Sequence, residues 1–258
     1  MTGGDDIFTD DGFLGGRLRI LQPRRGFRAG IDSVLLAAAV PARAGDAVFE
    51  AGTGPGVAAL CLAARVNGVV ITGVEEEITS AMLAEKNARR NGLEKALSVI
   101  HADICDVLKP GMAGMPRPGS FRHAFANPPY FDAGTVARPE NARRAAAHVF
   151  APGDLDDWVK AMTVMVAHRG TVSIIYPASH LERLLAACAR RLGSLRVLPL
   201  FTRPGRPARR VIVRGVKGAR GPLELLPGML LQDGEGKFTP RAEEILRAGA
   251  ALDMGDGG

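Results

Sequence analysis

From Asp46 onward, short apolar runs alternate with longer segments whose apolar positions recur every three or four residues. The short runs predict buried strands and the longer segments predict the helices that connect them. We expect an α/β fold with a doubly wound, mostly parallel sheet of about seven strands. The expected strands are 46–51, 69–74, 97–101, 121–126, 170–176, 194–201 and 208–216, and the expected helices are 56–66, 76–91, 153–168 and 178–192.

The N-terminal part follows a different pattern. Residues 1–12 are polar, and we expect them to be frayed. Arginines interleave with apolar residues over 14–31, around Pro23 and Gly26, which predicts a hairpin with one basic face. A solvated charged face is the alternative. Asp32 or Ser33 is then expected to cap a short apolar helix that runs to Val40.

These patterns predict an N-terminal extension over 1–41, made of a hairpin and a short helix, followed by one main domain over 42–250. A last helix, capped by Thr239, should close the main domain. Residues 251–258 are rich in glycine and are expected to be a disordered tail. At 258 residues and 47% hydrophobic content, the chain can bury a full core.

Charge and cysteine content narrow the class of protein. Lys and Arg total 33 against 27 Asp and Glu, and this excess permits a polyanionic partner. The three cysteines lie far apart, so we expect neither a disulfide framework nor a metal site. We find no apolar leader and no apolar run of membrane-spanning length, so we expect a cytoplasmic protein without a membrane partner. The oligomeric state is not predicted.

Asn127-Pro128-Pro129-Tyr130 directly follows the strand expected at 121–126. The two prolines restrict the backbone, so the Pro128 carbonyl and the Asn127 side-chain oxygen can both face a ligand, with the Tyr130 ring beside them. Two acceptors and a flat ring suit a planar amino group such as that of adenine, whose nitrogen lone pair is otherwise delocalised into the ring. On its own, Asn-Pro signals only a turn.

A glycine loop follows the strand expected at 46–51, within Glu50-Ala51-Gly52-Thr53-Gly54-Pro55-Gly56. Glycines let the backbone approach a ligand closely. Gly54 to Ala59 also match a loose dinucleotide-binding pattern. That interpretation places its first glycine late after the strand and leaves Asn127 and Tyr130 unexplained. Together and in this order, the two motifs resemble the S-adenosylmethionine-dependent amino-methyltransferases that carry Asn-Pro-Pro-Tyr.

The resemblance implies a class I methyltransferase (Rossmann-like) fold with S-adenosylmethionine as cofactor, and roles for acids at two further strand ends. Glu75, which ends the second strand, would bind the ribose hydroxyls. Its neighbour Glu76 is a further candidate, and helix-start acids are the alternative for Glu76 and Glu77. Asp103 and Ile104 would hold the cofactor's adenine, with a helix cap as the alternative for Asp103. The remaining cofactor candidates are Asp32, Glu50, Gly52, Thr53, Gly54, Gly56 and Asn127.

Over nearly its whole length the chain is similar to the tRNA adenine-N6 methyltransferases that modify the adenosine just 3′ of the anticodon in a valine tRNA. Besides the two motifs, the likeness is carried by Gln22, Phe27-Arg28, residues 30–36, Gly73-Val74-Glu75, residues 144–148, 200–204, Phe238-Thr239 and 245–247. It implies tRNA or another structured RNA as partner, with Asn127, Pro128, Pro129 and Tyr130 at the target adenine. Neither a metal nor a covalent nucleophile is required, because positioning the two reactants supplies most of the catalysis.

Three alternatives stay open at this point. Protein glutamine methyltransferases and rRNA guanine-N2 methyltransferases use the same Asn-Pro-Pro chemistry on a planar amino group. A catalytically silent RNA-binding protein with a methyltransferase fold is a third. Arginine content favours RNA, because one run without acids holds Arg203, Arg206, Arg209, Arg210, Arg214, Lys217 and Arg220. A solvated edge is the alternative for that run.

Overall fold

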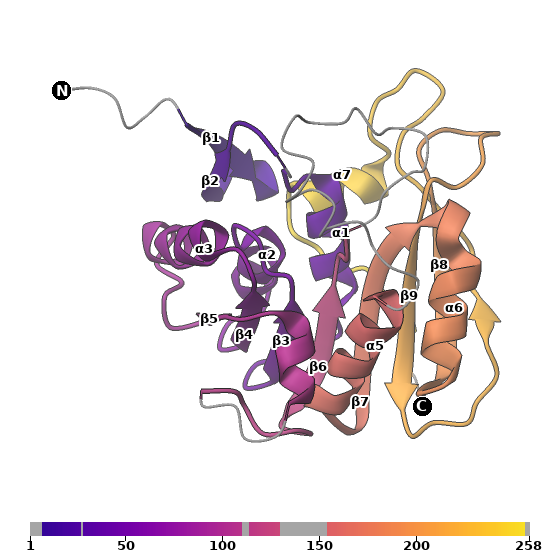
Figure 1. Ribbon diagram of the computed structural model, residues 1–258. Helices are drawn as coiled ribbons and strands as arrows, with labels where there is room; N and C mark the ends of the chain where they lie inside the picture. The colour runs from indigo at the N-terminus through magenta and orange to yellow at the C-terminus, as the bar shows by residue number, and fades with distance from the viewer. Residues whose placement is uncertain (1–6, 27, 110–113, 130–153, 256–258) are drawn as a thin grey trace, which may run out of the picture.

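The computed structural model describes residues 7–26, 28–109, 114–129 and 154–255. Within these ranges, the centre of the molecule is a nine-stranded sheet in the order β10-β8-β9-β7-β6-β3-β4-β5, with β11 beside β8 (Figure 1). Strands β3 to β7 are parallel, whereas β9 is antiparallel to both of its neighbours. The strands are β3 Ala47–Ala51, β4 Val70–Glu75, β5 Leu97–His101, β6 Phe121–Ala126, β7 Val166–Pro177, β8 Leu192–Phe201, β9 Arg210–Lys217, β10 Glu224–Leu225 and β11 Met229–Leu230.

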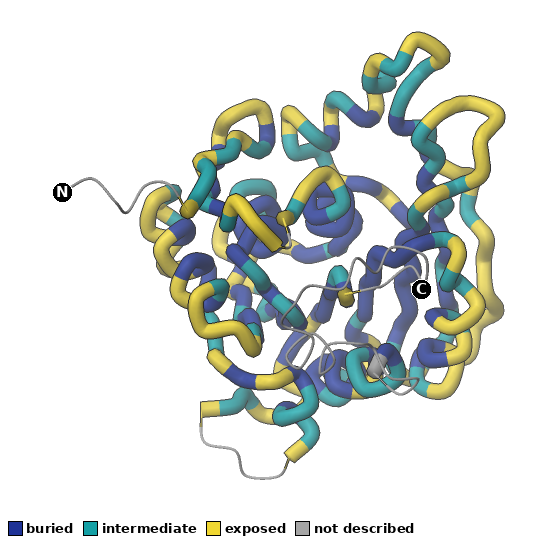
Figure 2. Tube along the Cα trace, turned by 45° about the horizontal axis from the view of Figure 1, so that its top comes forward, coloured by how far each residue is buried: buried dark blue, intermediate teal, exposed yellow. Residues whose placement is uncertain are grey.

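Helices cover both faces of the sheet. One face packs against α1 (Ile31–Ala39), α2 (Val57–Arg65), α3 (Ile78–Arg90) and α7 (Pro240–Leu246), and the other against α5 (Asp154–Met165) and α6 (Leu181–Ala189). Successive side chains of a strand point to opposite faces, so Val48 lies in the first core and Phe49 in the second. Figure 2 shows the buried strands across the centre and exposed residues on the outer helices and loops.

The expected α/β architecture is confirmed, and the differences lie mainly at element ends. Strand β7 begins at Val166, earlier than expected, because α5 already ends at Met165. The helix expected over 178–192 starts as the 3-10 turn η4 (Ala178–His180) and ends at Ala189. Within the described ranges, no helix combines the length and the apolar character needed to cross a membrane.

The C-terminal segment corrects one expectation and confirms another. Thr239 caps α7, because its hydroxyl accepts the Ala242 N–H at 3.3 Å. The expected disorder is wrong for residues 251–255. There the Leu252 N–H donates to the Ala38 carbonyl at 2.8 Å, and the side chains of Leu252 and Met254 are buried. Two apolar residues thus hold this glycine-rich end on the core.

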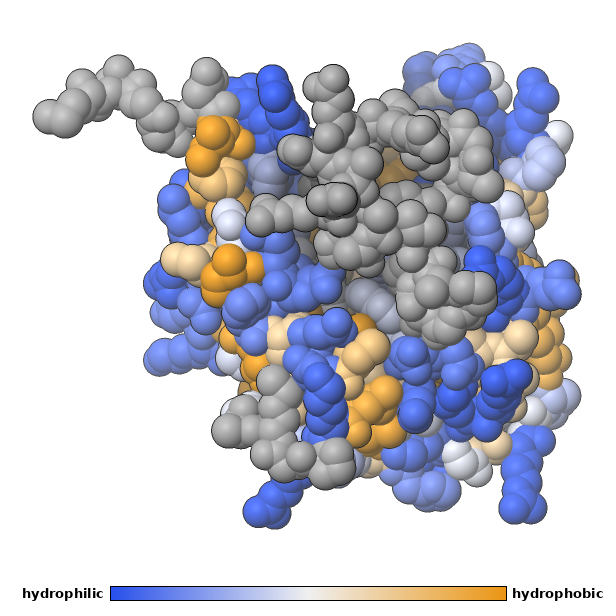
Figure 3. Space-filling model, viewed as in Figure 1, coloured by the Kyte–Doolittle hydropathy of each residue, from blue (hydrophilic) through white to orange (hydrophobic). Residues whose placement is uncertain are grey.

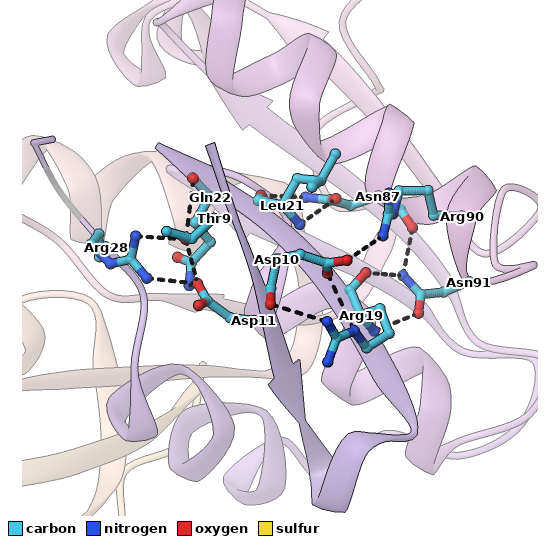
Figure 4. A network of polar contacts seen from close by, with 10 residues as sticks. All are labelled: Thr9, Asp10, Asp11, Arg19, Leu21, Gln22, Arg28, Asn87, Arg90 and Asn91. Carbon is cyan, nitrogen blue, oxygen red and sulfur yellow. Dashed lines mark hydrogen bonds and ion pairs between the residues drawn. The ribbon is translucent and has the colours of Figure 1, made fainter. Parts of the chain in front are cut away.

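The N-terminal hairpin lies earlier in the chain than expected. Strand β1 (Phe8–Phe13) pairs antiparallel with β2 (Leu18–Pro23), and the 3-10 turn η1 (Leu14–Gly16) joins them. The expectation that 8–12 are frayed is therefore wrong, and so is a hairpin centred on Pro23 and Gly26. Acids of β1 stabilise this pairing, since Asp10 forms ion pairs with Arg19 and Arg90. Asp11 pairs with Arg28 at 2.7 Å (Figure 4).

Asn87 of α3 holds the hairpin against the rest of the fold. Its side chain is fully buried; its oxygen accepts the Leu21 N–H and its amide donates to the Leu21 carbonyl, each at 2.9 Å (Figure 4). The same amide also donates, at 2.9 Å, to the carbonyl of Pro55 in the glycine loop. Asn91 makes the equivalent pair of bonds to the backbone N–H and carbonyl of Arg19, at 2.9 and 3.0 Å. Its amide makes its further bond to the Asn87 carbonyl, at 2.8 Å, instead of to the glycine loop.

The start of α1 also differs from the expectation. Gly30 is the N-cap residue, and no side chain caps the helix. Ser33 is buried, whereas the Asp32 carboxylate instead binds Arg210 at 2.9 Å. A capping role for Asp32 or Ser33 is therefore wrong, and Asp32 ties α1 to the first residue of β9.

We predict that Asn87→Ala lowers the free energy of unfolding by about 2 kcal/mol, because it leaves two carbonyls and one N–H without their partner. Urea denaturation measures this loss. Asn91→Ala is the matched control, and it should cost less because its bonds to Arg19 are more exposed. Equal losses in the two variants would show that the loop contact adds nothing.

Candidate active site

The carboxyl ends of four neighbouring strands meet at one edge of the sheet. Ala51 of β3 is in register with Val74 of β4 on one side and with Ala126 of β6 on the other, and Glu75 is in register with His101 of β5. The chain proceeds from β3 outward to β5 and then returns to β6 on the opposite side of β3. Such a reversal of strand order is where open α/β sheets bind their ligands.

This edge brings together most of the residues that the sequence singled out. The glycine loop follows β3, Glu75 ends β4, Asp103 follows β5 and Asn127 follows β6. Because neighbouring strands lie about 4.8 Å apart, these groups fall along one row. The arrangement agrees with the expected site, and the role of each residue stays a prediction.

The glycine loop is fixed on its outer side and open at its tip. The N–H groups of Gly52 and Thr53 both donate to the Val74 carbonyl, at 2.9 and 3.1 Å. Gly52 has a φ of 67°, and a Cβ at this position would lie 2.5 Å from a ring carbon of Trp158. At Gly54, with a φ of 55°, a Cβ would meet no atom of the described residues within 4 Å. A ligand can therefore approach the Gly54 backbone on the side where other residues carry a side chain.

Glu75 links the loop to the start of α3. Its two carboxylate oxygens accept the N–H groups of Gly54, at 2.8 Å, and of Glu77, at 3.0 Å. Burial raises the pKa of Glu75, and the two backbone bonds partly offset that rise. Each oxygen keeps a second lone pair, so Glu75 can still accept bonds from a pair of hydroxyls, as expected for a ribose.

Glu50 is a buried acid at the end of β3. Its side chain is 4% exposed, and neither its Oε2 atom nor the Thr53 hydroxyl has a hydrogen-bond partner in the described part of the chain. Burial raises the pKa of Glu50 well above its usual value, and the Glu75 charge raises it further. Since an unpaired buried acid is costly, the site fits a ligand that brings a cation, such as the ammonium group of S-adenosylmethionine.

Most of the remaining cofactor candidates have hydrogen bonds or packing contacts within the protein itself. Glu77 is the N-cap residue of α3 and accepts the N–H groups of Thr79 and Ser80. Glu76 is exposed and also lies before the helix, so neither acid belongs to the first turn of α3. Asp103 caps the 3-10 helix η2 (Ile104–Leu108) through the Cys105 N–H at 2.8 Å, which is the alternative weighed for it. Ile104 is buried beside it. Gly56, with a φ of 86°, packs closely against α3 at Ala84.

Asn127 lies where the row of strand ends meets solvent. It is half-buried, and its side chain has no hydrogen-bond partner among the residues that the structure describes. Pro128 is buried and Pro129 is exposed. Tyr130 and the stretch 144–148 lie outside the described residues. An amide next to a buried proline, beside the glycine loop, leaves an acceptor available for an incoming amino group.

Sequence reasoning missed two residues that support the site, Trp158 and Asn87. Trp158, the single tryptophan of the chain, lies against Gly52. Asn87 connects the loop to the hairpin. A signal existed for Asn87, because it lies among the buried alanines 84 and 88 on the core face of an amphipathic helix. A polar residue at such a position calls for specific partners.

Comparisons with known proteins agree with this geometry. Residues 28–155 match the family model of the methyltransferase small domain. The chain belongs to the S-adenosylmethionine-dependent methyltransferases. Its relatives include a tRNA1(Val) (adenine(37)-N6)-methyltransferase from Actinobacillus succinogenes, 29% identical over 208 residues, which are 80% of this chain and 84% of the relative. The corresponding protein of Aeromonas hydrophila is 28% identical over 213 residues, covering 81% and 85% of the two chains.

Solved structures support the same fold. A predicted O-methyltransferase from Agrobacterium tumefaciens superposes with a TM-score of 0.72 at 25% identity, covering 86% of this chain and 98% of that one. A tRNA (m1A58) methyltransferase from Aquifex aeolicus gives a TM-score of 0.53 at 17% identity, covering 77% and 72%. The second likeness shows the fold alone. The enzyme is therefore a class I methyltransferase that uses S-adenosylmethionine.

We predict that Glu50→Gln weakens S-adenosylmethionine binding at least 10-fold, about 1.4 kcal/mol, yet stabilises the ligand-free protein at pH 8. The folded-state pKa of Glu50 lies above its ordinary value of 4.5. Its contribution to stability is therefore fully present below pH 4.5 and is lost as the pH rises through the folded-state pKa.

Melting temperatures of the two ligand-free proteins between pH 4.5 and pH 8 measure the stability effect, and calorimetry at pH 7 measures the affinity. The advantage of Glu50→Gln should shrink as the pH falls. Glu85→Gln, at an exposed position of α3, is the control and should show neither effect. A wild-type protein that is the more stable at pH 8 would contradict the buried-acid account.

Proposed function

We propose that this methyltransferase transfers the methyl group of S-adenosylmethionine to the exocyclic N6 of an adenine in tRNA. The observation that carries the proposal is the position of Asn127, which directly follows the strand next to β3 and the glycine loop. Its side-chain amide has no hydrogen-bond partner within the described ranges. The curated relatives are named for this reaction at adenine 37 of tRNA1(Val). We infer the same class of site in this chain, acting in the cytoplasm.

At this edge of the sheet, one set of residues would bind the cofactor and another set would bind the adenine. Glu50, Glu75 and the backbone at Gly54 would hold the cofactor, which supplies both the methyl group and its own leaving group. The Asn127 side-chain oxygen and the Pro128 carbonyl would accept the two hydrogens of the adenine amino group. These bonds would favour a tetrahedral nitrogen, whose lone pair could then form the N–C bond as the cofactor's S–CH3 bond breaks. The methylated nitrogen would afterwards release one proton to solvent. Catalysis then rests mainly on positioning.

Incubation with radiolabelled S-adenosylmethionine and an unmodified tRNA1(Val) transcript tests the proposal. After digestion to nucleosides, the label should appear in N6-methyladenosine, and a transcript with guanosine at position 37 should remain unlabelled. In parallel incubations with ribosomal RNA or with a protein pool, label in 2-methylguanosine or in protein glutamine would instead support the other Asn-Pro-Pro reactions. Cofactor binding without transfer to any RNA or protein pool would indicate a silent RNA-binding protein.

We predict that Asn127→Ala lowers the rate of methyl transfer at least 1000-fold, about 4 kcal/mol of barrier, because the amino group loses an acceptor that acts at the reacting nitrogen. The dissociation constant for S-adenosylmethionine should stay within a few fold of the wild-type value. Single-turnover assays and calorimetry measure the two quantities. A large loss of cofactor affinity would show that Asn127 mainly supports the cofactor.

A further inference from the structure

The loop 202–209 lies at the same edge of the sheet as the active site. Strand β8, which precedes the loop, is antiparallel to β9, and β9 is antiparallel to β7. Therefore β8 runs in the same direction as β7 and β6, and its carboxyl end lies at the edge where Asn127 follows β6. Figure 1 shows this connection at the top of the molecule, next to the loop that precedes α7.

A cavity of about 560 Å³, open to solvent, lies at this connection. Its described lining consists of Thr202, Arg203, Arg206, Pro207, Ala208, Arg209 and Gln232. We call it the arginine pocket. In Figure 3, hydrophilic residues gather at the upper right of the molecule, over the part of the sheet where this connection lies in Figure 1.

The positive charge of the arginine pocket is not neutralised within the described chain. Arg203, Arg206 and Arg209 are exposed, and their guanidinium groups have no acidic or hydrogen-bonding side-chain partner among the described residues. The acids that follow Gln232 are engaged elsewhere. Asp233 accepts the N–H groups of Glu235 and Lys237, each at 2.9 Å, and Glu235 pairs with Lys237 at 2.7 Å.

The backbone of the pocket is held in place before any ligand arrives. The Arg206 N–H donates to the Arg203 carbonyl at 3.4 Å, and the Arg209 N–H donates to the Leu200 carbonyl at 3.2 Å. Across the pocket, the Gln232 N–H donates to the Thr202 carbonyl at 3.0 Å. Pro204 and Pro207 further restrict the loop. A preformed backbone lowers the ordering cost of binding.

We infer that the arginine pocket binds a backbone phosphate of the RNA whose adenine enters the active site. Guanidinium groups present forked donors that match phosphate oxygens, and the Gln232 amide can supply another donor. Three strand spacings separate β8 from β6, which at about 4.8 Å each is roughly 14 Å. A stacked strand advances about 3.4 Å per nucleotide, so the phosphate belongs to a nucleotide about four positions from the target.

This inference rests on the proposed function, and the double variant Arg206→Ala/Arg209→Ala tests it. We expect its dissociation constant for the unmodified tRNA1(Val) transcript to rise at least 10-fold. The slope of log affinity against log salt concentration should become shallower by about 1, since one phosphate contact is lost. The dissociation constant for S-adenosylmethionine and the rate at saturating tRNA should stay within twofold of the wild-type values.

Arg117→Ala/Arg122→Ala is the matched control. It removes the same charge at exposed positions near the start of β6, at the opposite edge of the sheet. Equal losses of tRNA affinity in the two double variants would overturn the inference. If wild-type enzyme methylates tRNA and the pocket variant binds it normally, only the pocket assignment fails. If wild-type enzyme neither binds nor methylates tRNA, the proposed function fails with it.

Should the alanine variant lose S-adenosylmethionine binding or melt early, Arg206→Lys/Arg209→Lys decides the question. It keeps the charge but not the forked donors, so we expect a dissociation constant about 3-fold higher with an unchanged salt slope. An unchanged dissociation constant would contradict a phosphate held by forked donors.

Discussion

The buried acid Glu50, whose Oε2 atom has no hydrogen-bond partner among the residues that the structure describes, is the constraint on which our account of the site depends. It is the last residue but one of β3, with Phe49 and Ala51 packed into the core on either side of it in the sequence. Its position is fixed by the strands on both flanks, β4 and β6. Burying this carboxylate lowers the free energy of unfolding of the ligand-free protein. Binding of a cationic ligand would offset that cost, which couples cofactor affinity to the fold.

The rest of the molecule places complementary groups along the same edge. On one side of β3, Glu75 holds the Gly54 N–H and so shapes the loop that faces the cofactor. On the other side, Asn127 follows β6, where we propose that it binds the target base. The hairpin is tied to this edge through Asn87, which bonds both Leu21 and Pro55. In the proposed account, one mostly parallel sheet would align the cofactor, the target base and the RNA backbone.

Regular parts of the fold were predictable from sequence, because parallel strands buried on both faces are continuous apolar runs. Strands 97–101 and 121–126 match the structure at both ends. The hairpin was misplaced because its pairing depends on ion pairs of Asp10 and Asp11 with arginines that lie from 9 to 80 residues further along the chain.

Within the site, sequence pointed to the strand-end acids and to Asn127, since those signals are local. It could not reveal that Asp32 binds Arg210, or that Trp158 lies against Gly52, because these contacts join segments about 100 or more residues apart. Nor could it show that Leu252 and Met254 hold the C-terminal segment on the core. Long-range contacts of single side chains leave no periodic pattern.

Proton release on cofactor binding tests the pairing of Glu50 with a cation most directly. Calorimetric titration with S-adenosylmethionine between pH 5 and 7, in buffers of different ionisation enthalpy, yields the number of protons exchanged. A cation placed beside Glu50 lowers its raised pKa, so the wild-type protein should release protons and Glu50→Gln should release markedly fewer. Equal proton exchange in the two proteins across this range would contradict the account.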